Sequence, residues 1–178
     1  MQKIIITGST GLIGSRIVEL LSDKLEFIPL PHSSVDITDI ESVAKALSTI
    51  NYDLLLHLAA YTNVDKAETE RDLAYAINVT GTKNLFETTQ KQGKKFIYLS
   101  TDFVFSGNNP PYFEESVPDP IGYYGQTKFE AEEIVKNKAM VVRLSYPYRA
   151  VFDKKKDFVR TIKSLLEQKK ELKMITDS

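Results

Sequence analysis

K-I-I-I-T-G-S-T-G-L-I-G, residues 3–14, is the stretch that decides the fold. The β-branched run at 4–6 predicts a short strand, and the apolar residues with helical spacing at 13–21 predict a helix. Glycines occupy the connection between these elements. A strand, a glycine-rich turn and a helix in this order are the context in which three glycines indicate a dinucleotide-binding loop.

Each glycine of this turn has its own physical role. Gly8 can take a positive φ, Gly11 lets the backbone approach a ligand, and Gly14 lets the new helix pack closely on the strand. The N–H groups that begin the helix have no partner within it and therefore face an anion. The turn predicts binding of a dinucleotide pyrophosphate, with an ordinary glycine turn as the simpler alternative.

The composition of the whole chain restricts the class of protein. The 178 residues suit one α/β domain, and 23 Lys and Arg against 24 Asp and Glu leave no basic surplus to favour nucleic acid or a membrane surface. No cysteine is present, which excludes disulfides and thiolate metal sites, and we expect no bound metal. No leader pattern opens the chain and no apolar run approaches membrane-spanning length. We therefore expect a soluble cytoplasmic protein.

Strand patterns alternate with helix patterns along the rest of the chain. This alternation predicts βαβ units, and hence an α/β fold with a doubly wound parallel sheet of Rossmann type, as a single domain over residues 1–178. Ligands of such sheets bind beyond the carboxyl ends of the strands. Further strands are expected at 26–30, 52–58, 96–99, 140–144 and 172–175, and further helices after a capping-box pattern at 38–41 and at 69–92, 123–136 and 158–168.

The end of the second predicted strand reads L-P-H-S-S at 30–34. A carboxylate at this place would accept a hydrogen bond from the ribose 2′-hydroxyl of NAD, but none is present. His32 and Ser33 would instead meet a 2′-phosphate, which favours NADP over NAD, with a plain polar turn as the alternative. Asp36 and Ile37 could edge the adenine, although Asp36 suits an Asx turn equally well.

Small residues follow the third predicted strand. Ala59, Ala60, Tyr61 and Thr62 leave room there for the middle of the cofactor, or they only pack the edge of the sheet. His57 lies within the apolar strand, and we interpret it as a packed histidine rather than a ligand because the chain has only two histidines.

Candidate catalytic residues lie directly after the fourth predicted strand and near the start of the next predicted helix. Tyr124 and Lys128 are four residues apart and share one face of a predicted helix. A fixed ammonium beside the phenol would favour the ionised phenol, so we expect the pKa of Tyr124 to fall towards neutrality. Thr101 or Ser100 could hold a carbonyl or alcohol oxygen of the substrate while a nicotinamide acts on the adjacent carbon. A solvated helix face is the alternative for the Tyr-Lys pair alone.

Five motifs together resemble the dTDP-4-dehydrorhamnose reductase family of extended short-chain dehydrogenases/reductases, and the resemblance runs through essentially the entire chain. They are A-A-Y-T-N-V-D-K-A-E at 59–68, I-N-V-T-G-T-K-N-L at 77–85, L-S-T-D-F-V-F-S-G at 99–107, P-Y-F-E-E at 111–115 and Y-G-Q-T-K at 124–128.

The resemblance implies a role for particular residues. Tyr124 would donate the proton, Lys128 would bind the nicotinamide ribose and tune Tyr124, and Thr101 would be the hydroxyl partner. Thr101 and Asp102 would also touch the sugar nucleotide, and Tyr146 stands where the family usually has a substrate-contacting tryptophan. The residues implied to line the cofactor are Gly11, Leu12, Ile13, Asp36, Ile37, Ala60, Tyr61, Thr62 and Leu99.

This chain departs from the family pattern in several places. Phe103 replaces a usual tyrosine, and Arg149 replaces the usual glycine after Tyr148. The chain also stops at Ser178, where the family continues into the segment that closes over the nucleotide sugar, so we expect that C-terminal lobe to be truncated or absent.

Three functions remain as hypotheses from the sequence. The first is an NADP-dependent reductase that delivers hydride to the C4 ketone of a dTDP-linked deoxysugar, on the route to dTDP-rhamnose for polysaccharide, with a homodimer as one option for its assembly. The second is a non-catalytic NADP-binding subunit similar to the regulatory subunit of methionine adenosyltransferase, which shares N-P-P-Y at 109–112. The third is a nucleotide-sugar epimerase with the same Tyr-Lys pair.

Overall fold

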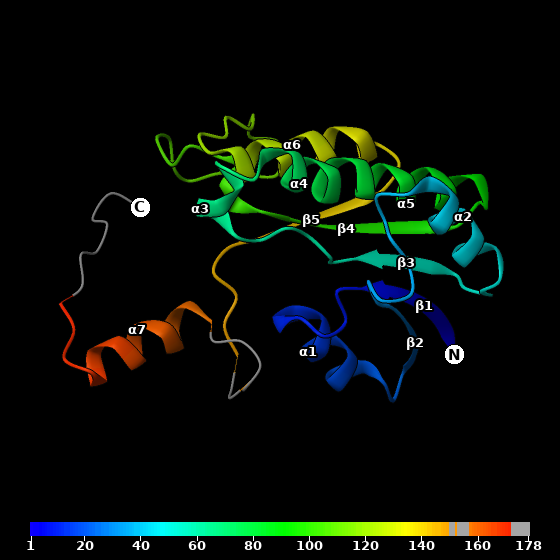
Figure 1. The fold of residues 1–178 in the computed structure, drawn as a ribbon, viewed down its shortest axis with the longest axis horizontal. Coiled ribbons are helices and arrows are strands. Elements are labelled where there is room, and N and C mark those ends of the chain that lie inside the picture. The colour runs from blue at the N-terminus through cyan, green and yellow to red at the C-terminus, as the bar shows by residue number, and fades with distance from the viewer. Residues whose placement is uncertain (150–151, 153–156, 172–178) are drawn as a thin grey trace.

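A parallel sheet of five strands forms the middle of the molecule, with strand order β2-β1-β3-β4-β5. The computed structural model describes residues 1–149, 152 and 157–171. This arrangement confirms the predicted doubly wound α/β fold of Rossmann type (Figure 1). The strands are β1 (Gln2–Thr7), β2 (Leu25–Leu30), β3 (Leu54–His57), β4 (Lys95–Thr101) and β5 (Met140–Leu144).

Helices cover both faces of the sheet. The helices α2, α4, α5 and α6 lie over one face, whereas α1 lies on the other (Figure 1). β1 pairs with β2 on one side and with β3 on the other, so the chain changes direction across the sheet at β1. The helices are α1 (Leu12–Leu21), α2 (Ile40–Ser48), α3 (Val64–Ala67), α4 (Arg71–Tyr75), α5 (Gly81–Lys91), α6 (Tyr123–Val135) and α7 (Phe158–Glu167), with a π-helical turn η1 (Ala76–Thr80) and a 3-10 turn η2 (Asp102–Val104).

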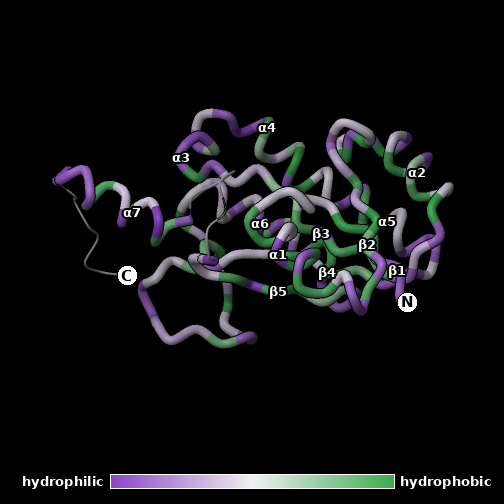
Figure 2. Tube along the Cα trace, turned by 90° about the horizontal axis from the view of Figure 1, so that it is seen from below, coloured by the Kyte–Doolittle hydropathy of each residue, from purple (hydrophilic) through white to green (hydrophobic). Residues whose placement is uncertain are grey.

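The hydrophobic core lies between the central strands and the helices on the α5 face. Ile5 and Leu55 are completely buried in neighbouring strands, and Leu85 of α5 is completely buried against them. The hydrophobic residues gather along the strands in the middle of the molecule (Figure 2). Because both faces of the inner strands are covered, these strands read as continuous apolar runs rather than as alternating patterns.

The predicted helix at 69–92 is present but is not uniform. α4, η1 and α5 follow one another without a break, and the π-helical turn η1 inserts a wider turn between them. Such turns inside helices occur frequently at functional sites. Asn78, which lies in η1, is buried.

Two other local predictions need correction. Asp39, and not Thr38, is the N-cap of α2, and its carboxylate accepts from the backbone N–H of Glu41 at 2.9 Å. Thr38 is engaged elsewhere, because its hydroxyl donates to Asp36 at 2.7 Å. β3 is also shorter than predicted, since Tyr52 lies outside the strand and is buried, with its hydroxyl donating to Gln92 at 2.6 Å.

The helix α7 stands off from the sheet (Figure 1). None of its residues is fully buried, and Phe158 and Leu166 are 48% and 59% exposed. The strand predicted at 172–175 lies outside the described residues. Within the part that is described, no helix has both the length and the apolar character needed to cross a membrane.

Candidate functional site

A cavity of about 520 Å³ opens at the carboxyl ends of β1, β3 and β4, where the chain direction switches across the sheet. Ligands of doubly wound sheets bind at this place. The cavity collects most of the predicted site residues, which come from five separate segments: the glycine-rich turn with the start of α1, the loop after β3, the end of β4, α6 and the loop after β5. These residues are Gly8, Gly11, Leu12, Ile13, Gly14, Ala59, Ala60, Thr62, Leu99, Thr101, Asp102, Tyr124, Lys128 and Tyr146.

The glycine-rich turn is packed so tightly that side chains would not fit. Gly8 has φ +67°, and a Cβ there would lie 2.9 Å from the backbone nitrogen of Ala59. A Cβ at Gly14 would lie 2.3 Å from the carbonyl oxygen of Gly8. Gly11 is the N-cap of α1 and brings no capping side chain, and the first turn of the helix contains no acid. The N–H groups at the start of α1 therefore remain suited to an anion.

Tyr124, Thr101 and Asp102 meet at the other end of the cavity. Tyr124 is 9% exposed at the start of α6, and its ring contacts Phe103 edge to face with centroids 5.7 Å apart. The hydroxyl of Thr101 donates to Oδ1 of Asp102 at 3.1 Å, and Ser145 donates to Oδ2 of Asp102 at 2.5 Å. The end of β4 thus presents a hydroxyl and a carboxylate in fixed orientations beside the buried phenol.

Lys128 is buried one helical turn after Tyr124. Its Nζ donates to the carbonyl oxygen of Leu99 at 2.8 Å and lies 4.2 Å from the centroid of the Tyr98 ring. Burial lowers the pKa of Lys128 to about 7, against the opposing effect of the carboxylate of Glu132. The side chain is therefore close to the point at which it gains or loses its charge at neutral pH.

The expected lowering of the Tyr124 pKa is not observed. The pKa of Tyr124 is raised, because burial of the phenol outweighs the stabilising hydrogen bond with Thr101, and the negative charge of Asp102 adds to the rise. Lys128 directs its Nζ to Leu99 instead. The sequence places the two residues on one helix face but does not show where the flexible lysine side chain ends. A neutral phenol is the form that can donate a proton.

Asn78 organises the loop that follows β3. Its Oδ1 accepts from the backbone N–H of Tyr61 at 2.8 Å, and its Nδ2 donates to the carbonyl of Tyr61 at 3.2 Å. The same Nδ2 also donates to the hydroxyl of Thr127 in α6 at 2.9 Å. Asn78 therefore fixes the backbone beside the cavity. The side chain of Tyr61 points elsewhere, because its hydroxyl donates to Glu70 at 2.5 Å and Tyr61 does not line the cavity.

His57 is a packed histidine, as predicted, and it is neutral. The hydroxyl oxygen of Thr7 accepts from the N–H groups of Leu58 and Ala59 and lies 2.8 Å from Nδ1 of His57, so it donates its own hydrogen to that nitrogen. The proton of the ring is thereby assigned to Nε2, which donates to Thr82 at 3.0 Å. Burial lowers the pKa of His57 to about 3, and the nearby charge of Lys128 adds to this effect.

Four residues predicted to bind the adenosine half lie outside this cavity. His32 and Ser33 are exposed in the turn after β2. Asp36 forms an Asx turn, since its Oδ1 accepts from the backbone N–H of Thr38 at 2.9 Å. Ile37 packs against Gly81 of α5, where a Cβ would lie 2.7 Å from the isoleucine side chain.

Several residues that line the cavity were not predicted. Thr10 lies within the glycine-rich turn, and its position between two of the glycines is the signal that could have identified it. Ser100, by contrast, was predicted as the alternative to Thr101, and its hydroxyl is buried at the cavity without a hydrogen-bond partner. The remaining additions are hydrophobic and carry no distinctive sequence signal: Leu58, Val64, Phe103, Leu144 and Pro147.

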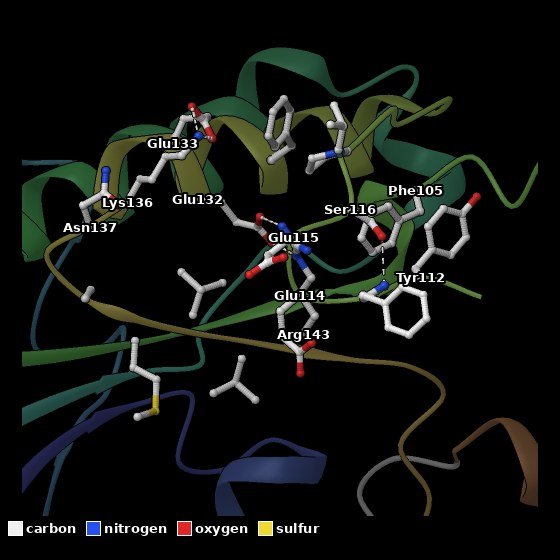
Figure 3. Close-up of a pocket in the computed structure, with 18 residues that line it drawn as sticks. Phe105, Tyr112, Glu114, Glu115, Ser116, Glu132, Glu133, Lys136, Asn137 and Arg143 are labelled. Carbon is white, nitrogen blue, oxygen red and sulfur yellow. Dashed lines mark hydrogen bonds and ion pairs between the residues drawn. The ribbon is translucent and has the colours of Figure 1, made fainter. Parts of the chain in front are cut away.

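A larger hollow of about 940 Å³ lies elsewhere, between α6, β5 and the loop at 105–118 (Figure 3). Glu132 and Arg143 both line it and are in direct contact, with N–O distances of 2.9 and 2.6 Å. No predicted site residue lines this hollow. The chemistry predicted from the sequence is therefore gathered in the smaller cavity.

Known proteins resemble this chain over most of its length. The dTDP-4-dehydrorhamnose reductase of Mycolicibacterium smegmatis is 35% identical over 170 residues, which cover 92% of this chain and 51% of that protein. That of Aggregatibacter actinomycetemcomitans is 30% identical over 183 residues, which cover 99% of this chain and 61% of that protein. The crystal structure of dTDP-4-dehydrorhamnose reductase from Bacillus anthracis in complex with NADP matches with a TM-score of 0.86 and 38% identity, covering 97% of this chain and 62% of that one.

These relatives are longer proteins, and the chain spans between 51% and 62% of their lengths. The family model for the RmlD substrate binding domain matches residues 1–178. The motifs at 59–68, 99–107 and 124–128, which carry the resemblance in the sequence, lie within this match. The chain belongs to the RmlD substrate-binding-domain family.

Proposed function

We propose that this chain binds NADPH and contributes the catalytic residues of a reductase that acts on the C4 ketone of a dTDP-linked 4-keto-6-deoxysugar. The observation that carries the proposal is the single cavity in which the glycine-rich turn, Thr101, Tyr124 and Lys128 meet. The named relatives are dTDP-4-dehydrorhamnose reductases, which supports this substrate class. Because the chain spans only part of their length, the activity of the whole protein is part of the proposal.

The glycine-rich turn fits a dinucleotide. Because Gly8 and Gly14 have no Cβ, the backbone of the turn can pack closely there. The N–H groups at the start of α1, which no side chain caps, suit a pyrophosphate. NADPH, when bound, supplies the hydride for reduction of the ketone. His32 and Ser33 are proposed to hold the 2′-phosphate, in a turn that brings no acid against it.

The residues of this chain handle the substrate oxygen and its proton. Tyr124 donates the phenolic proton to the ketone oxygen as that oxygen becomes an alcohol, and the raised pKa keeps the phenol in its donor form. Thr101 would turn the hydroxyl hydrogen that it donates to Asp102 towards the same oxygen and so orient it. Lys128, whose Nζ donates to the carbonyl oxygen of Leu99 beside the cavity, would hold the ribose. Asp102 and Tyr146 contact the sugar nucleotide.

The first test measures oxidation of NADPH by its absorbance, with and without a dTDP-4-keto-6-deoxysugar. We expect oxidation that depends on the sugar and falls by at least about 100-fold in Tyr124→Phe, as for loss of a general acid. Tyr123→Phe is the matched control, because Tyr123 is the adjacent tyrosine of α6 and does not line the cavity. Unchanged turnover in Tyr124→Phe would contradict the proposed role of the phenol.

Other outcomes of this assay distinguish the alternative functions. Tight NADPH binding without oxidation would favour a non-catalytic binding subunit. Interconversion of nucleotide sugars without net change of the cofactor would favour an epimerase. The relatives named above favour the reductase.

The preference for NADPH has a separate test. His32→Glu places a carboxylate where the 2′-phosphate is proposed to lie, so the ratio of the NADPH to the NADH dissociation constants should rise by about tenfold. An unchanged ratio would exclude His32 from the phosphate site.

Location and assembly also remain proposals. We propose a cytoplasmic enzyme, with a homodimer as one option. Light scattering of the purified chain would give its mass in solution and decide between monomer and dimer.

A further inference from the structure

Arg149 connects two walls of the cavity that are far apart in the sequence. One wall is the start of α1 with the glycine-rich turn, and the other is the loop after β5, residues 145–149, which contributes Tyr146 and Pro147. We infer that Arg149 is a positioning residue that holds this loop against α1 and so sets the shape of the cofactor cavity. The inference rests on the proposed function, which makes this cavity the NADPH site.

The guanidinium of Arg149 bonds to α1 at three places. Nη1 donates to the hydroxyl of Ser15 at 2.8 Å and to the carbonyl oxygen of Leu12 at 3.4 Å, and Nη2 donates to the carboxylate of Glu19 at 2.7 Å. The side chain of Arg149 is only 13% exposed. A planar guanidinium with several donors is suited to such a multiple contact, whereas a lysine would satisfy only part of it.

Ser15 passes this contact on to the glycine-rich turn. Its hydroxyl donates its single hydrogen to the carbonyl oxygen of Gly11 at 2.7 Å while it accepts from Arg149. Gly11 lines the cavity and is the N-cap of α1. The loop after β5 is therefore linked to the proposed pyrophosphate site through two consecutive hydrogen bonds.

The opposite end of the loop carries Tyr146 in a conformation that needs support. Tyr146 has φ +41°, a region that residues with a side chain rarely adopt unless the surrounding structure holds them there. Its ring contacts Phe158 with centroids 5.0 Å apart, and it remains 48% exposed. The backbone N–H of Arg149 donates to Asp157 at 3.3 Å, so Arg149 holds the loop by its backbone as well as by its side chain.

Tyr146→Trp provides a direct reporter of this wall, because the chain contains no tryptophan. In this background we compare Arg149→Met with the unsubstituted arginine by the fluorescence anisotropy of the indole and by titration with NADPH. In the absence of cofactor, we expect the indole of Arg149→Met to have lower anisotropy than that of the parent, because the loop after β5 is no longer held against α1. If the cavity is competent only about a tenth of the time, the dissociation constant for NADPH should rise about tenfold.

Arg16→Met is the matched control. Arg16 also pairs with Glu19, at 2.7 Å, but this contact lies within α1 and does not reach the loop after β5. It should leave the anisotropy unchanged and alter NADPH binding by less than about twofold, as for an exposed pair. Arg149→Lys should give intermediate values, and Glu19→Gln tests the same contact with Arg149 retained if Arg149→Met does not fold.

The outcomes separate the two levels of proposal. Equal anisotropy of the indole in Arg149→Met, Glu19→Gln and the parent overturns the positioning role, whether or not NADPH binds. If Arg149→Met has lower anisotropy than the parent but the parent itself does not bind NADPH, the positioning role is supported and the proposed function is overturned. If Arg149→Met lowers the anisotropy of the indole but leaves the dissociation constant for NADPH unchanged, the inference that this loop sets the shape of the cofactor site is overturned.

Discussion

The carboxylate of Glu68 accepts a hydrogen bond from the backbone N–H of Tyr123 at 2.6 Å, although the two residues are 55 positions apart. Tyr123 is the first residue of α6, and the N-cap residue of that helix, Gly122, offers no side-chain cap. Glu68 therefore performs the capping function from a distance. The negative charge also complements the positive end of the helix that carries Tyr124 and Lys128.

Removal of this remote cap should destabilise α6. We expect Glu68→Ala to lower the free energy of unfolding by about 1 kcal/mol, as for loss of an N-cap, measured by urea denaturation. Glu68→Gln keeps an acceptor oxygen and should lose less. Glu133→Ala is the control, since Glu133 forms an exposed pair with Lys136 on the same helix and should change stability by less than about 0.5 kcal/mol. Equal effects at both positions would argue against a capping role.

The low pKa of Lys128 should appear in the pH dependence of stability. The folded protein holds this proton with a pKa of about 7, against an ordinary value of 10.5, so between these values the unfolded chain binds more protons than the folded one. Stability from this group therefore rises with pH through that window. The free energy of unfolding of the parent, relative to Lys128→Met, should increase from pH 7 to 10.5. A constant difference would show that Lys128 keeps an ordinary pKa.

Gly8 and Gly93 offer a matched comparison of strain with and without a close contact. Both have positive φ, +67° and +65°, but a Cβ at Gly8 would meet the backbone of Ala59 at 2.9 Å, whereas a Cβ at Gly93 would meet nothing within 4 Å. We expect a loss of about 1 kcal/mol for Gly93→Ala and about 3 kcal/mol for Gly8→Ala, since overpacking adds to the strain. Thermal unfolding measures both losses of stability. Similar losses for the two variants would mean that the backbone around Gly8 can move to accommodate the new methyl group.

Asn78 should contribute more to stability than a neighbouring buried asparagine. Asn78→Ala leaves the N–H and C=O of Tyr61 without their partner, and we expect a loss of about 2 to 3 kcal/mol. Asn84→Ala removes a bond from Nδ2 to the carbonyl of Ile37 at 3.0 Å and should cost about 1 kcal/mol. Chemical denaturation of both variants checks the order. The reverse order would contradict the assignment of Asn78 as the main support of the loop after β3.

The alternation of short apolar runs with helical patterns was sufficient to predict the parallel sheet. Burial of both faces requires such runs, and the glycines at 8 and 14 fit the tight contact between β1 and α1. The glycine-rich turn and the resemblance to the family together identified most of the residues that line the cavity. These features are local in the chain or recur as fixed spacings, so a single sequence contains them.

Contacts between distant segments could not be predicted in this way. The spacing of Tyr124 and Lys128 shows a shared helix face, but the contact of Lys128 with Leu99 depends on how closely α6 approaches β4, and that approach reversed the expected shift of the Tyr124 pKa. Likewise, nothing near Glu68 indicates that it caps α6.

The sequence by itself determined the order of strands and helices, the glycine-rich turn and the identity of the reactive side chains, because each depends on the properties of neighbouring residues. The tertiary structure decided which groups are charged and which loops are held together, including the attachment of Arg149 to α1. The physical reason is that burial and partner distance set pKa values and hydrogen bonds, and both quantities exist only after distant segments have packed against one another.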